Sequence, residues 1–105
     1  MDDEQALIST DGEMRVHGEM TIYRAGEVAQ ALFAAIRAHD GDVSLDLSAV
    51  TEFDTAGLQL VLMARRMAET NGRRLDVVQP SECVAEVLGL CHVAATTDTQ
   101  QQAAS

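Results

Sequence analysis

The chain has 105 residues, the size of one ordinary domain. Seven basic residues, all arginines, stand against seventeen acidic ones, so the formal net charge is −10. This balance argues against binding to nucleic acid, which needs clustered cations, and the lack of lysine excludes a lysine nucleophile. Hydrophobic residues make up 47% of the chain but only three residues are aromatic, so we expect an aliphatic core.

The first half of the chain predicts two strands, a helix and a third strand. Residues 6–10 and 14–17 flank an Asp-Gly pair, which is a hairpin signal. From residue 24 to residue 39 apolar side chains recur at helical spacing and alanine is abundant. Residues 43–47 then alternate apolar and polar side chains, as in a strand with one buried face.

The second half alternates helices with a strand. Residues 49–53 are interpreted as a linker to a helix over residues 55–69, which an Asn-Gly pair ends. Residues 75–78 form a fourth strand, and Ser81 caps a third helix whose apolar stripe includes Cys91. Because right-handed crossovers place helices on the faces of a sheet, this order predicts an α/β domain with a mixed sheet covered by helices.

We expect one domain over residues 5–97 and a flexible tail over residues 98–105. The chain from residue 94 onward is mostly Ala, Thr and Gln and has no core-forming pattern. Whether a final strand forms after Val93 stays open at this point.

The most informative segment joins the third strand to the second helix and ends in Asp54-Thr55-Ala56-Gly57-Leu58. Asp54 stands where a helix N-cap is expected, and the first turn of a helix offers unpaired N–H groups. A phosphate on Thr55 would be favoured there by roughly 0.3–1 kcal/mol, and Gly57 would let another backbone approach closely. A purely structural interpretation is also open, in which the motif only caps the helix and packs tightly.

This segment and its surroundings resemble the STAS family, the sulfate transporter and anti-sigma-factor antagonist domains. The resemblance covers residues 7–93 and rests on the order of elements, on Leu-Asp-Leu-Ser at residues 45–48, on the motif at residues 54–58, and on the Asn-Gly pair at residues 71–72. It implies a STAS-like fold with a mixed sheet of four to five strands. It also implies a non-enzymatic switch, in which a partner kinase phosphorylates the hydroxyl residue beside the aspartate and the phosphorylated form is released.

Two features depart from the family pattern. Family members often carry two hydroxyl residues between the aspartate and the glycine, whereas the second position here is Ala56, so only Thr55 is a phosphate acceptor in this motif. If the acceptor corresponds to the position before glycine, this chain cannot be switched in that way. The final strand usual in the family is reduced at best to residues 93–97.

A helical wheel places Leu58 and Leu62 on the polar side of the second helix, one turn or more from Thr55. Leucines among charged residues suggest a docking patch, although isolated exposed leucines are ordinary and another helix might equally cover them. With the motif beside them we favour docking. The predicted contact residues are Asp54, Thr55, Ala56, Gly57, Leu58 and Leu62.

The partner implied by the resemblance is an anti-sigma-factor or serine-kinase-like protein, and the implied role is a cytoplasmic, bacterial regulator of transcription. Similar small STAS proteins serve instead as constitutive accessory subunits of lipid-transport ABC complexes, where the same helix start packs on the ATPase. A chemotaxis or other signalling array is a third possibility. An enzyme is not expected, since no cluster supplies a nucleophile with a base.

Membrane insertion, a metal and a cofactor are not expected either. The longest apolar run, residues 60–64, is far below the roughly 20 residues of a membrane-spanning helix. The acidic residues 2–4 do not resemble a secretory signal. Cys83 and Cys91 lie eight residues apart in one helical pattern, too far for an intrahelical disulfide, which favours a cytoplasmic setting. The three histidines are dispersed without metal-ligand spacing.

Overall fold

The computed structural model describes residues 6–90. The predicted final strand, the predicted tail and Cys91 therefore lie outside the described residues. The elements in chain order are β1 (Leu7–Thr10), β2 (Glu13–Val16), β3 (Gly18–Met20), α1 (Ala25–Ala38), β4 (Val43–Asp46), β5 (Val50–Phe53), α2 (Thr55–Thr70), β6 (Leu75–Val78) and α3 (Glu82–Leu90).

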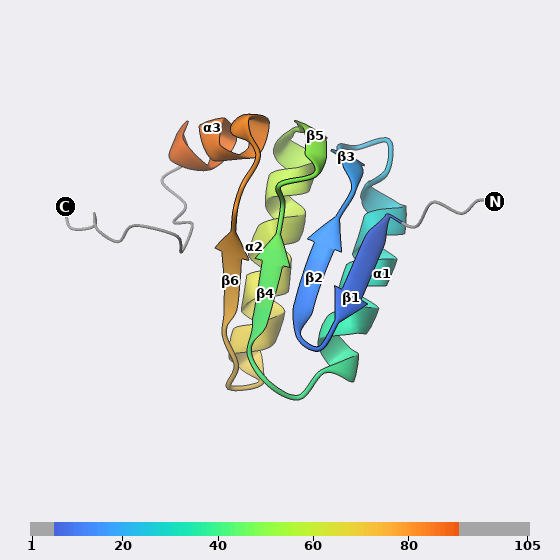
Figure 1. Ribbon diagram of the computed structural model, residues 1–105, viewed down its shortest axis with the longest axis vertical. Coiled ribbons are helices and arrows are strands. Elements are labelled where there is room, and N and C mark those ends of the chain that lie inside the picture. The colour runs from blue at the N-terminus through green and yellow to red at the C-terminus, as the bar shows by residue number, and fades with distance from the viewer. Residues whose placement is uncertain (1–5, 91–105) are drawn as a thin grey trace.

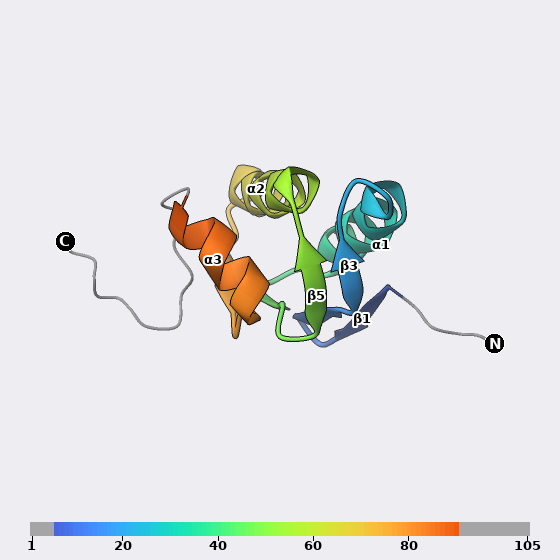
Figure 2. The same cartoon turned by 90° about the horizontal axis from the view of Figure 1, so that it is seen from above.

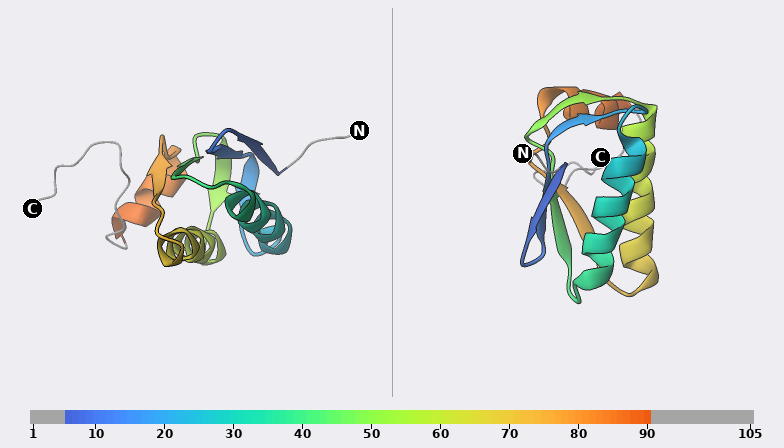
Figure 3. Two further views of the ribbon diagram at one scale, coloured as in Figure 1. Left: turned by 90° about the horizontal axis from the view of Figure 1, so that it is seen from below. Right: turned by 90° about the vertical axis from the view of Figure 1, so that its right-hand side faces the viewer.

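Four strands form the main sheet, in the order β1-β2-β4-β6. β1 and β2 are antiparallel, whereas the β2–β4 and β4–β6 pairs are parallel, so the predicted mixed sheet is confirmed. Helices α1 and α2 lie side by side on one face of this sheet. Helix α3 lies beside β5, at one end of the main sheet (Figures 1 and 2). The opposite face carries no helix along residues 6–90 (Figure 3). We call it the open face.

A second, smaller sheet pairs β3 with β5 in parallel. The prediction of a linker over residues 49–53 was therefore wrong. Each strand has only three or four residues, and the partner segments are about thirty residues apart, with Gly18 opposite Val50 and Met20 opposite Phe53. Short strands of this kind have too few residues for an alternating pattern to show. The pair carries the chain beyond the main sheet to the start of α2 (Figure 1).

The core between the sheet and the two helices is aliphatic, as predicted. The helical repeat expected in α1 is the buried face of that helix, formed by Val28, Leu32 and Ile36. In α2 the buried face consists of small and branched residues, which lets the two helices pack closely. The largest side chains that are fully buried among the described residues are methionines, leucines, an isoleucine and valines.

Both helices begin at one end of the molecule and finish at the other (Figure 1). The predicted stop of α2 is confirmed: the helix ends at Thr70, and Gly72 has a φ of +73°, in the left-handed region that favours glycine. Just beyond, Nη1 of Arg73 donates to the carbonyl oxygens of Ile36, at 3.0 Å, and His39. This guanidinium group is a second donor to the carbonyl oxygen of Ile36, which also accepts from the N–H of His39 at 3.3 Å, and it is a donor to the carbonyl oxygen of His39 at the end of α1.

Candidate functional site

Asp54 begins the site, because its carboxylate caps α2. Its Oδ1 accepts hydrogen bonds from the backbone N–H of Ala56, at 2.9 Å, and of Gly57, at 3.2 Å. The backbone of Asp54 is extended, as an N-cap residue requires, and its carbonyl oxygen accepts from the N–H of Leu58. The predicted cap is therefore confirmed.

The other oxygen of Asp54 has a partner that the sequence did not indicate. Its Oδ2 accepts from the backbone N–H of Ile22 at 3.1 Å, and the Asp54 N–H donates to the carbonyl oxygen of Met20 at 3.4 Å. Ile22 lies 32 residues earlier, in the loop between β3 and α1. One carboxylate thus fixes the start of α2 and this loop relative to each other.

The hydroxyl of Thr21 also makes hydrogen bonds within this loop and to the end of β3. This buried threonine donates its hydroxyl proton to Oε1 of Glu19 at 2.9 Å and accepts from the N–H of Tyr23 at 3.3 Å. The next two side chains project outward: Ile22 is 69% exposed and Tyr23 is 89% exposed. Large apolar side chains on a fixed loop are a feature of contact surfaces.

Gly57 is buried where α2 meets β3. A Cβ at this position would lie against the carbonyl oxygen of Met20 and 2.9 Å from the ring of Phe53. The close backbone approach expected at this glycine is therefore made within the chain, by β3.

The predicted contact residues have different exposures. Thr55 is exposed in the first turn of α2, and Ala56 is half-buried. Leu58 is half-buried and packs against the core, while Leu62 is 41% exposed and Met63 is 52% exposed. Of the two predicted leucines, Leu62 therefore presents the larger apolar surface. It lies seven positions after Thr55, which is about 10 Å along the helix on the same side.

These observations define what we call the α2-start surface: the exposed residues Ile22, Tyr23, Thr55 and Leu62. The β3–α1 loop and the start of α2 lie at the same end of the molecule (Figure 1). The two loop residues were not predicted from the sequence, because the loop meets α2 only in the folded chain. A signal was nevertheless present, since Ile22 and Tyr23 follow the last strand residue and fall outside the helical repeat of α1.

The chain as a whole carries a net charge of −10, whereas Arg65 and Arg66 follow Leu62 within about one turn of α2. Glu52 is exposed just before α2. The nearby Arg24 is engaged within the chain, since its Nη1 donates to the carbonyl oxygen of His17 at 2.8 Å and its Nε lies 3.8 Å from Glu27. A partner with basic groups around an apolar contact would complement the net negative charge.

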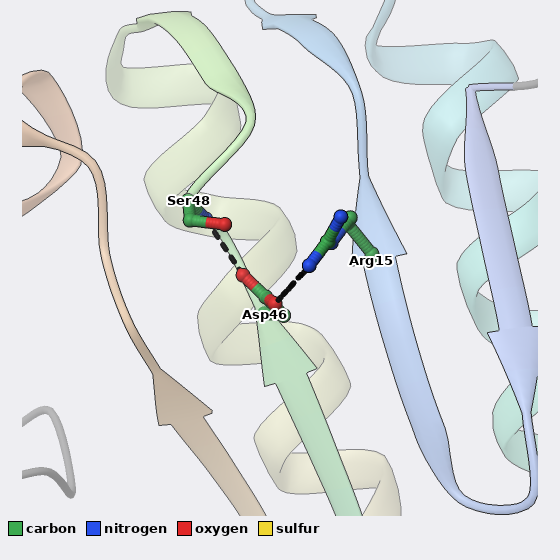
Figure 4. A network of polar contacts seen from close by, with 3 residues as sticks. All are labelled: Arg15, Asp46 and Ser48. Atoms are coloured by element: carbon green, nitrogen blue, oxygen red, sulfur yellow. Dashed lines mark hydrogen bonds and ion pairs between the residues drawn. The ribbon is translucent and has the colours of Figure 1, made fainter.

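A separate polar network lies on the open face of the main sheet (Figure 4). Asp46 accepts from the backbone N–H of Ser48 at 2.8 Å and from Nη2 of Arg15 at 3.2 Å. Burial alone would raise the pKa of Asp46, but the hydrogen bonds from Ser48 and Arg15 and the charge of Arg15 outweigh it, so the pKa is lowered. The network does not touch the α2-start surface, and it fixes β4 beside β2.

Two further findings concern residues 6–90 only. No group of three or more histidine, cysteine, aspartate or glutamate side chains there is arranged to hold a metal ion. No helix within the same range has the length and apolar character needed to span a membrane.

A family model and several solved structures are similar to this chain. The model of a family described as "Mlab, STAS domain" matches residues 6–96. The anti-sigma factor antagonist SpoIIAA, in its unphosphorylated form, is similar in structure with a TM-score of 0.66 and 22% identity, over 83% of this chain and 79% of that one. A crystal structure of Mglu has a TM-score of 0.56 and 22% identity, over 72% of this chain and 19% of that one. At this identity the two structures show a shared fold.

Proposed function

The chain belongs to the STAS domain family, and on that premise we propose that it is a non-enzymatic regulatory module that binds a partner protein through the start of α2. In this proposal phosphorylation of Thr55 by a partner kinase switches the binding off. The observation that carries it is the position of Thr55: its side chain is exposed in the first turn of α2, and exposed apolar residues lie in the loop tied to Asp54 and two turns further along the helix.

The proposed contact combines two parts of the chain. Ile22 and Tyr23 from the β3–α1 loop and Leu62 from α2 supply apolar area, and aromatic residues are frequent among the contacts that dominate binding energy. Asp54 holds the two parts in one geometry before the partner arrives. Such preorganisation lowers the entropic cost of association.

Phosphorylation would act on the surface more than on the fold. A phosphothreonine carries about −1.5 to −2 charges at neutral pH. At position 55 it would stand beside the carboxylate of Asp54, which already accepts from the N–H groups of Ala56 and Gly57. The phosphate would therefore stay at the surface, where it places a strongly hydrated charge next to the apolar contact residues. Docking would then require its desolvation, which disfavours the complex.

The partner class we propose is an anti-sigma-factor or serine-kinase-like protein, in line with the fold shared with an anti-sigma factor antagonist. The net charge of −10 favours a partner with a basic rim. Because such steering acts between exposed charges, we expect the association rate to fall as salt is added.

A second candidate uses the same surface without a switch. In it the chain is a constitutive subunit of a lipid-transport ABC complex, and the start of α2 packs on the ATPase. The residue that favours this candidate is Ala56, which stands where STAS switches often carry a second hydroxyl residue. Thr55 would then be an ordinary contact residue.

Capture of the partner separates the two candidates. The full chain, carrying an affinity tag, is used to capture proteins from its own host with and without ATP, and Thr55 is then examined by mass spectrometry. A captured kinase whose binding is lost with ATP, together with phosphate on Thr55, supports the switch. A captured ATPase that stays bound with ATP, and an unmodified Thr55, support the subunit role.

Variants of Thr55 give the matched test. We expect Thr55→Ala to bind the partner without being phosphorylated, and Thr55→Asp not to bind. Thr70→Asp, the same chemical change at the exposed far end of α2, is the control and should bind as the unmodified chain does. If Thr55→Asp bound the partner as tightly as the unmodified chain does, the proposed switch would be contradicted.

A further inference from the structure

The open face of the main sheet is unusual for strands of this type. β2, β4 and β6 are parallel to one another, and parallel sheets are in most proteins covered on both faces. Here α1 and α2 cover one face only, and the other is free of helices along residues 6–90 (Figure 3). Part of this face is apolar, since Ile8 of the edge strand β1 is 50% exposed.

The strand register arranges the side chains of the open face in two rows. Each row crosses β1, β2, β4 and β6 in that order. The first row is Ile8, Arg15, Asp46 and Val78, and the second is Thr10, Glu13, Ser44 and Asp76. A hollow of about 540 Å³ lies over the two rows and is lined by residues of both.

Strand β2 carries two charges of opposite sign on the open face, Glu13 and Arg15, and only Arg15 has an ion-pair partner within residues 6–90. Arg15 is half exposed and donates from Nε and Nη2 to Asp46, while its Nη1 makes no bond within residues 6–90. Glu13, two residues away on the same face, is exposed and has no ion-pair partner in that part of the chain. The face thus offers one free carboxylate and one free guanidinium edge side by side.

We propose that the open face binds a second copy of this chain, face to face. A two-fold axis that lies between the two faces and crosses β2 near Met14 makes the two β2 strands antiparallel. Glu13 of each copy then stands opposite Arg15 of the other, so the charges of β2 are complementary to themselves across the axis. Packed sheets lie about 10 Å apart, a distance that two long side chains span together.

The area of the open face indicates how strongly two copies can bind. Four strands about 4.8 Å apart and four residues long cover a footprint of roughly 250 Å². That is below the area of a stable permanent interface, so we expect a weak, reversible dimer. The net charge of −10 on each copy opposes association over long distances. Salt at about 0.15 M screens this repulsion beyond about 8 Å, whereas the ion pairs across the interface are closer than that.

Sedimentation equilibrium of the full chain up to about 1 mM tests the proposal, at about 0.15 M salt. We expect a concentration-dependent monomer–dimer equilibrium. Glu13→Arg and Arg15→Glu should each raise the dissociation constant about tenfold or more, because each places like charges opposite each other. Arg37→Glu, an equal charge reversal at the exposed end of α1, is the control and should leave the equilibrium unchanged.

The most stringent test is to mix the two variants, Glu13→Arg and Arg15→Glu. A Glu13→Arg chain and an Arg15→Glu chain are complementary to each other, so the mixture should form heterodimers although each alone is monomeric. Glu13→Arg removes no bond of the folded chain, so its result does not depend on a loss of stability. A monomer at every concentration, unchanged dimers in both variants, or a mixture that stays monomeric would each overturn the proposal. Because this face lies opposite α1 and α2, Thr55→Asp should not affect dimers, and failure here leaves the proposed partner binding untouched.

Discussion

The two ends of α2 are built alike but present different surfaces. At its start, the carboxylate of Asp54 accepts from the N–H groups of α2 and from Ile22 in the loop before α1. Just past its end, the guanidinium of Arg73 donates to carbonyl oxygens at the end of α1. Each charge has the sign that the helix termini favour. The start, however, also exposes Ile22 and Tyr23, whereas no large apolar side chain among the described residues is exposed around Arg73.

A polar tie at the end of a helix therefore does not by itself identify a functional end. Both ties bond backbone groups at a helix terminus, and both join segments far apart in the sequence. What distinguishes the start of α2 is exposed apolar area beside an exposed hydroxyl. We therefore expect changes at either end to affect stability, but only changes at the start of α2 to affect partner binding.

The largest effect is expected from Gly57→Ala. The added methyl group would meet the carbonyl oxygen of Met20 and the ring of Phe53, so we expect a loss of about 1–3 kcal/mol in the free energy of unfolding, measured with urea. Gly26→Ala is the matched control, because nothing lies within 4 Å of a Cβ at that helical position. It should be neutral or stabilising. Equal stability of the two variants would contradict the tight contact at the start of α2.

A loss of about 1–3 kcal/mol is expected from Arg73→Ala, because it removes the guanidinium that donates to the carbonyl oxygens of Ile36 and His39 at the end of α1. The control is Arg74→Ala, whose side chain is 69% exposed and pairs with Asp76 at the surface. That change should cost less than about 1 kcal/mol. Partner binding, measured below the unfolding transition, should be normal in both variants. If a folded Arg73→Ala protein failed to bind the partner, the binding surface would not be confined to the start of α2, and the account would be contradicted.

Asp54 allows its two roles to be separated. Asp54→Ala removes the cap and should cost about 0.5–2 kcal/mol of stability. Asp54→Asn keeps one oxygen to cap α2 but turns the other acceptor into a donor, so the bond from the N–H of Ile22 is lost. We expect this variant to be nearly as stable as the unmodified chain but to bind the partner more weakly. Hydrogen exchange at the amide of Ile22, followed by NMR, should become faster, and an unchanged rate would show that the tie is not made.

The smallest effect concerns acid stability and lies away from both ends. The pKa of Asp46 is lowered in the folded chain from its ordinary value of 3.8, so the unfolded chain binds the proton more readily. The stabilisation from this carboxylate is therefore complete above pH 3.8 and is lost as the pH falls through the lower, folded pKa. Its size should be below about 1 kcal/mol, since the network is near the surface. Asp46→Asn should unfold with a shallower pH dependence below pH 3.8 in thermal melts, and an identical dependence would contradict this assignment.

The sequence predicted the parts of the fold that rest on a repeated local pattern. The spacing of Val28, Leu32 and Ile36 predicted α1, and the Asp-Gly and Asn-Gly pairs predicted turns at the correct places. Asp54 was identified as a cap because its role depends on residues two and three positions away. Local sequence is sufficient for features of this kind.

The remaining features depend on contacts between distant segments. The pairing of β3 with β5 and the bond from Ile22 to Asp54 join residues about thirty positions apart, and no periodicity records them. The half-buried position of Leu58 likewise follows from how α2 rests on the core, which a helical wheel does not give. The α2-start surface was therefore only half visible, with the helix side predicted and the loop side missed.

The central claim, that phosphate on Thr55 blocks docking at the start of α2, is tested most directly by one affinity measurement. The chain is prepared with phosphothreonine at position 55 throughout, and its binding to the captured partner is compared with that of the unmodified chain by calorimetry at equal salt. We predict a dissociation constant raised at least about a hundredfold, with little change in thermal stability. Equal dissociation constants for the two forms would contradict the account.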